Sequence, residues 1–79
     1  MMSIRIQADE AKRLKNDTAF QQFVQDVRDV QLSIFANSTA QEVEQREEAH
    51  AIMRALNQIE MQLDAAIAAE RMLDRSKQE

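Results

Sequence analysis

Apolar residues recur at spacings of three and four along the second half of the chain. A repeat of 3.5 residues keeps apolar side chains on one helical face, so the pattern predicts an amphipathic helix over residues 40–76. Two capping boxes are open at its start, Ser38 with Gln41 or Thr39 with Glu42. The repeat comprises Ala49, Ile52, Leu56, Ile59, Leu63 and Ala66, and it is widened by Met53 and Ile67.

The same repeat occurs earlier in the chain and predicts a helix over residues 18–36. A polar turn at residues 36–39 is short enough to make the two helices antiparallel neighbours. A turn centred near Ser38 pairs Val27 with Ala49 and Phe23 with Ile52, which makes the phenylalanines core residues. The repeat is Phe20, Phe23, Val27, Val30 and Ile34, flanked by Val24 and Phe35.

A weaker apolar stripe predicts a short helix over residues 7–15, followed by a break at which Asp17 is a good N-cap. Only half of the long helix is covered by the first hairpin helix. Either the N-terminal segment folds back along the other half, with Leu14 near Leu63 and Ala11 near Ala66, or a second copy covers it. On the second alternative the interaction surface is exposed and comprises Leu63, Ala66, Ile67, Met72 and Leu73.

Composition limits the fold class. The chain has 79 residues and contains no Cys, Gly or Pro, so disulfides and glycine-based turns are excluded. We therefore expect one all-α domain over residues 1–79, an antiparallel helical hairpin with coiled-coil-like packing, a long second helix and a short N-terminal helix. A core this small is marginal, which favours a homo-oligomer.

Localisation follows from the hydropathy pattern. No apolar run approaches the length of a membrane span, and no apolar segment typical of a signal peptide follows Met1. We expect a soluble protein that is not secreted and has no membrane partner.

Charge is unevenly distributed. The formal net charge is −4, but the basic residues of the first sixteen outnumber the acidic ones, and the remainder is acidic. An acidic body makes nucleic acid an unlikely partner, because duplex binding needs a face that neutralises phosphates. The basic start either contacts phosphate or an acidic partner, or forms a solvated helix face.

The single histidine suggests the one constellation worth testing for metal binding. Glu47 and His50 form a Glu-x-x-His pair, which supplies two metal ligands in helical-bundle iron proteins. The predicted pairing places Asp26 and Asp29 opposite them. Residues 46–53 resemble the corresponding stretch of encapsulated ferritins, although the acidic first helix of that family is replaced by Gln21, Gln22 and Gln25. We assign no metal and no cofactor, and keep the four residues as candidates.

Catalysis is not expected. The chain lacks Cys and Tyr, and Ser33, Ser38 and Thr39 have no histidine within reach in the hairpin. Its carboxylates are interspersed with arginines on helix faces, as solvated surfaces are. We therefore do not expect an enzyme.

Residues 11–21 and 46–60 carry a broader resemblance. Their order resembles a family of small helical proteins of tailed bacteriophages that are often encoded among head-morphogenesis genes, and the similarity covers roughly residues 8–70. Thr18 replaces the proline of the family's Asn-Asp-Pro-x-Phe break, and its Gly-Lys tail is missing. The resemblance implies a role in virion assembly, in the host cytoplasm or the virion.

Three functions therefore compete. The first is a phage structural or assembly protein that binds itself and other virion proteins. The second is a small helical adaptor or chaperone, similar in form to the hairpin chaperones of secretion needles. The third is a metal protein built on carboxylates and histidine.

Overall fold

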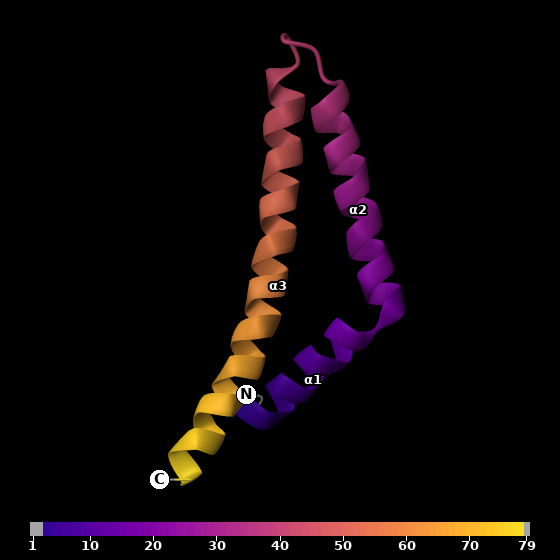
Figure 1. Ribbon diagram of the computed structural model, residues 1–79. Coiled ribbons are helices and arrows are strands. Elements are labelled where there is room, and N and C mark those ends of the chain that lie inside the picture. The colour runs from indigo at the N-terminus through magenta and orange to yellow at the C-terminus, as the bar shows by residue number, and fades with distance from the viewer. Residues whose placement is uncertain (1–2, 79) are drawn as a thin grey trace.

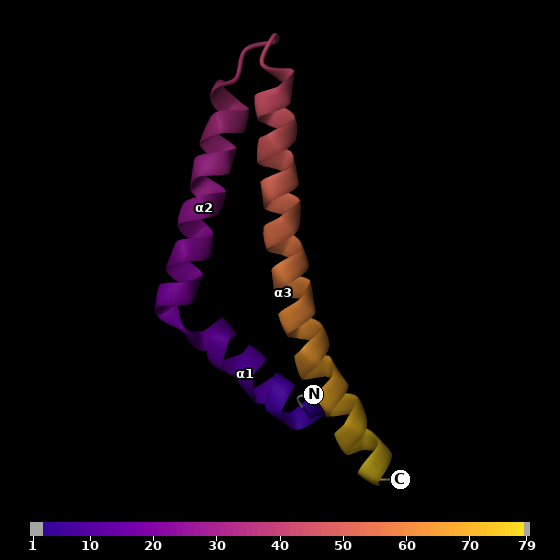
Figure 2. The same cartoon turned by 180° about the vertical axis from the view of Figure 1, so that it is seen from behind.

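The computed structural model describes residues 3–78, and side-chain exposure for residues 3–76. This part of the chain contains three helices, α1 (Ile4–Asn16), α2 (Thr18–Asn37) and α3 (Val43–Gln78), and no strand. The predicted all-α class is thus confirmed. Figure 1 shows α2 and α3 as an antiparallel hairpin whose arms diverge away from the connecting turn, while α1 runs back to α3. Figure 2 shows the same arrangement from behind, and the molecule is 58 Å long and about 23 Å wide.

Helix α1 begins three residues earlier than the apolar pattern predicts, because Ser3 caps it. The Ser3 hydroxyl accepts a hydrogen bond from the backbone N–H of Ile6 at 3.1 Å. Asp17 separates α1 from α2, as predicted. Its carboxylate accepts from the N–H of Phe20 at 2.9 Å, and its own N–H donates to the carbonyl of Leu14. One residue therefore ends α1 and caps α2.

Helix α3 begins at Val43 rather than at residue 40. Of the two open capping boxes, the structure uses the one that joins Thr39 to Glu42. The Glu42 carboxylate accepts from the backbone N–H of Thr39 at 3.0 Å, whereas the Ser38 hydroxyl donates to the carbonyl of Phe35. The connection consequently spans residues 38–42, and its centre lies later than the Ser38 assumed from sequence.

This later turn changes the register between α2 and α3. Buried Ala49 shares a hollow with buried Gln31, one helical turn after the Val27 expected there. Farther from the turn, the Arg28 guanidinium donates to Asn57 at 3.0 Å and to Glu60 at 2.8 Å. Polar residues thus occupy part of the face of α2 that the apolar repeat was expected to fill.

The prediction that all three phenylalanines belong to the core is wrong for two of them. Phe23 is 72% exposed and Phe35 is also exposed, whereas Phe20 is half-buried. The cause is the register, since the face of α2 that meets α3 is centred on Gln31 instead of on the Phe23 and Val30 positions.

Helix α1 packs against the C-terminal half of α3. Of the two alternatives left open by the sequence, the structure therefore shows the one in which the N-terminal segment folds back along the long helix. Ala8 and Ala11 are buried in this contact. Their small side chains allow the two helix backbones to approach closely. Within residues 3–76 the only buried apolar residues are these two alanines and Ala49, and no large side chain is fully buried.

Candidate functional site

The metal-ligand candidates are not brought together. Glu47 and His50 line a shallow hollow of about 230 Å³ beside the turn. On α2, Asp26 accepts from Gln22 at 2.7 Å and Asp29 accepts from Gln25 at 2.8 Å. Within the described residues, no three His, Cys, Asp or Glu side chains lie close enough to hold a metal ion. The expected convergence fails because it depended on the register that the later turn shifts.

A larger cleft of about 290 Å³ opens where α1, α2 and α3 meet. The charged groups that line it are paired, because Arg28 bonds to Glu60 and Lys15 bonds to Asp64. Gln21 also donates its side-chain amide to the backbone carbonyl of Lys15. Its remaining lining residues are Phe20, Val24, Gln25 and Leu63. The cleft therefore combines apolar walls with ion pairs and holds no nucleophile beside a general base.

Most of the interaction surface predicted on the second half of the long helix is partly covered, and its binding of a partner stays a prediction. Leu63, Ala66, Ile67 and Leu73 are half-buried, whereas Met72 is 68% exposed. The physical reason is that α1 lies along this half of α3.

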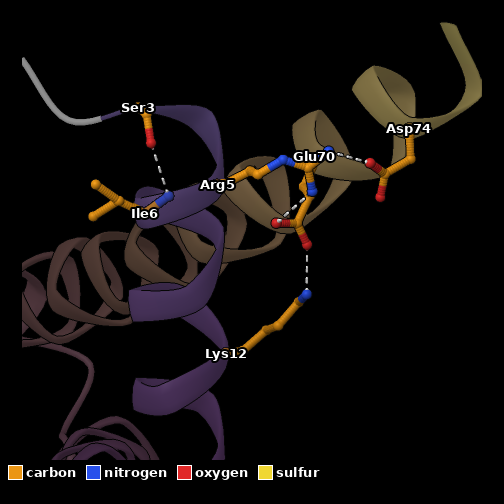
Figure 3. Close-up of polar contacts among 6 residues, drawn as sticks. All are labelled: Ser3, Arg5, Ile6, Lys12, Glu70 and Asp74. Carbon is orange, nitrogen blue, oxygen red and sulfur yellow. Dashed lines mark hydrogen bonds and ion pairs between the residues drawn. The ribbon is translucent and has the colours of Figure 1, made fainter. Parts of the chain in front are cut away.

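Ion pairs hold α1 in place. Arg5 donates to Asp74 at 2.6 Å and Lys12 donates to Glu70 at 2.6 Å, as the dashed lines in Figure 3 show. These hydrogen bonds raise the pKa of Arg5 and of Lys12 above their ordinary values. Lys15 completes the set with its bond to Asp64. The basic start of the chain thus has an acidic partner, and that partner is α3.

Sequence reasoning missed these three acidic residues as partners. The excess of basic charge before residue 16 indicated an acidic partner as one alternative, but nothing in the local pattern located it. In the structure, lower-numbered residues of α1 meet higher-numbered residues of α3, so the two helices are antiparallel.

An exposed apolar face lies on α2. The members of the predicted repeat that follow Phe20 are all exposed, and we call these four residues the α2 seam: Phe23, Val27, Val30 and Ile34. Their spacing of four, three and four keeps them on one side of the helix. The sequence identified this repeat but assigned it to the interior of the hairpin.

Neither a protein-family model, nor a curated protein, nor a solved structure matches this chain. Among the helices of the described residues, none is long and apolar enough to cross a membrane.

Proposed function

We propose that this protein is a non-enzymatic helical interaction module that associates with itself and serves as a structural or assembly component of a tailed-phage virion. The observation that supports self-association is the distribution of apolar residues. Among the apolar residues in the described part of a single chain, only three alanines are buried, while the α2 seam is exposed. Because apolar burial is the main favourable term in folding, a chain that buries so little needs a partner surface.

The total surface supports the same proposal. The chain exposes 6269 Å², whereas a compact monomer of its mass of 9.1 kDa is expected to expose about 4,900 Å². The excess of roughly 1,400 Å² lies within the range of about 1,000–2,500 Å² that each subunit of an obligate dimer buries.

Self-association is tested by sedimentation equilibrium of the purified chain at low micromolar concentration. The proposal predicts a mass of at least twice the 9.1 kDa of one chain. A helical protein that sediments as a monomer would contradict it. The experiment needs no partner and does not depend on the phage context.

The virion context is supported by the resemblance of residues 8–70 to small helical phage proteins. We infer that other virion proteins are partners, met in the host cytoplasm or in the virion. Mass spectrometry of purified virions tests this inference, which predicts peptides of this chain at a reproducible copy number. Their absence from virions, together with co-purification of the chain with assembly intermediates, would favour the adaptor or chaperone instead.

A further inference from the structure

We propose that the α2 seam binds the α2 seam of a second copy, with the two α2 helices antiparallel and a twofold axis between Val27 and Val30. This inference rests on the proposed self-association and assigns it to one surface and one orientation. It replaces the second half of α3 as the association surface, because α1 already lies there.

The spacing within the seam indicates that its occupant is a helix. Residues at intervals of four, three and four form the narrow apolar line that packs knobs into holes against another helix. Phe23 is 72% exposed and Val30 is 54% exposed, so neither has found that helix within its own chain. Helix α3 instead meets the adjacent face of α2, which carries Arg28 and Gln31.

The seam is complementary to itself. When two copies are aligned antiparallel about the proposed axis, Phe23 lies opposite Ile34 of the second copy, and Val27 lies opposite Val30. The two largest side chains then fill the outer layers and the valines fill the inner ones. Antiparallel alignment also sets the two helix dipoles in opposition, whereas a parallel pair would align them.

The flanks of the seam are compatible with a second copy. Asp26, on the outer edge of the seam, falls near Ser33 of the second copy, so no carboxylate faces another. On the side toward α3, Ile34 and Ile52 line one hollow of about 250 Å³. Ile52 is half-buried, and Ile59, two helical turns later, is exposed. Ala55 and Gln62, which flank Ile59 on that face, are uncharged, and the lining of the hollow also includes Glu48.

The first test replaces Val27 and Val30 together by Glu in the full-length chain. A matched control places the same two charges at other exposed apolar positions, Leu32→Glu with Met61→Glu. We expect the Val27→Glu, Val30→Glu variant to weaken association at least about tenfold, because carboxylates are desolvated at the seam. The control should associate as the wild type does. Sedimentation equilibrium measures both.

The outcomes separate this inference from the proposed function. A monomeric wild type overturns self-association and the seam with it. An oligomeric wild type whose assembly survives Val27→Glu with Val30→Glu, or is lost equally in the control, overturns the seam alone.

Cross-linking tests orientation and does not depend on a charge substitution. The chain contains no Cys, so Phe23→Cys and Ile34→Cys each introduce a single thiol. We expect a short bis-maleimide to cross-link a mixture of the two variants refolded together, but neither variant alone. In the antiparallel pair, identical positions at residue 23 are separated by roughly 16 Å along the axis. Efficient cross-linking of Phe23→Cys with itself would indicate a parallel pair and overturn the proposal, as would no cross-link in the mixture.

Discussion

The ammonium of Lys12 lies 2.6 Å from the carboxylate of Glu70, which is 58 residues away in the sequence. The guanidinium of Arg5 lies 3.9 Å from the other oxygen of the same carboxylate. Glu70 is buried, and it is the acidic residue at the centre of the contact between α1 and α3. These charges lie beside the apolar contact made by Ala8 and Ala11, and they fix the position of α1 along α3.

Replacing Glu70 by Ala should release α1. The change leaves Lys12 and Arg5 without the carboxylate they share, and added salt should weaken the contact in the same direction by screening the exposed pairs. Hydrogen exchange should show amides of residues 4–16 exchanging about tenfold faster. The exposed Glu47→Ala on the same helix is the control, and unchanged protection of α1 in Glu70→Ala would contradict this role.

Enlarging Ala8 should separate the two helices. Ala8 is completely buried, so the added atoms of Ala8→Leu have no space and should lower the free energy of unfolding by about 1–3 kcal/mol. Ala19→Leu, at an exposed position on α2, should change it little. Thermal melts followed by circular dichroism measure both variants. Equal stability of Ala8→Leu and the wild type would mean that α1 and α3 do not pack closely.

The hydrogen bond that Glu42 accepts before α3 should make the protein less stable at acid pH, where Glu42 becomes protonated. The hydrogen bond from the Thr39 backbone lowers the pKa of Glu42 below its ordinary value of 4.5. A group whose pKa is lower in the folded state contributes stability that is present above the ordinary pKa and is lost as pH falls through the folded value. The melting temperature of the wild type should therefore fall more steeply below pH 4.5 than that of Glu42→Gln. Glu47→Gln is the control, and its melting temperature should follow that of the wild type. If the melting temperatures of the wild type and Glu42→Gln fell equally with pH, this role of Glu42 would be contradicted.

Metal ions should not stabilise the protein. The carboxylates of Asp26 and Asp29 are bonded to glutamines on their own helix, away from a shared site with Glu47 and His50. Adding Fe²⁺ or Zn²⁺ should leave the melting temperature unchanged. A rise that disappears in both His50→Gln and Glu47→Gln would restore the metal-binding alternative.

The helices themselves were predictable because their information is local. The 3.5-residue repeat places α2 and α3, and Asp17 marks the boundary before Thr18 through its capping bond. Ser3 caps α1 in the same way, so that helix begins before the weak apolar stripe from which its start was predicted.

The pairing between helices was not predictable because it depends on the centre of one turn. Thr39 with Glu42 and Ser38 with Gln41 were equally good capping boxes by sequence. The structure uses the first, and the register shifts by one helical turn. A heptad repeat shows that Phe23 and Val30 suit a helical partner, but it does not say which helix. The partners of Lys12 and Lys15 lie 58 and 49 residues farther along the chain and have no local signature.

The concentration dependence of thermal unfolding tests self-association most directly. If folding is completed by a second copy, mass action makes the melting temperature rise with protein concentration. We predict a continuous rise from low micromolar to high micromolar protein, and Val27→Glu with Val30→Glu should remove it. A melting temperature that stays constant over this range, in a helical protein of monomeric mass, would contradict the account.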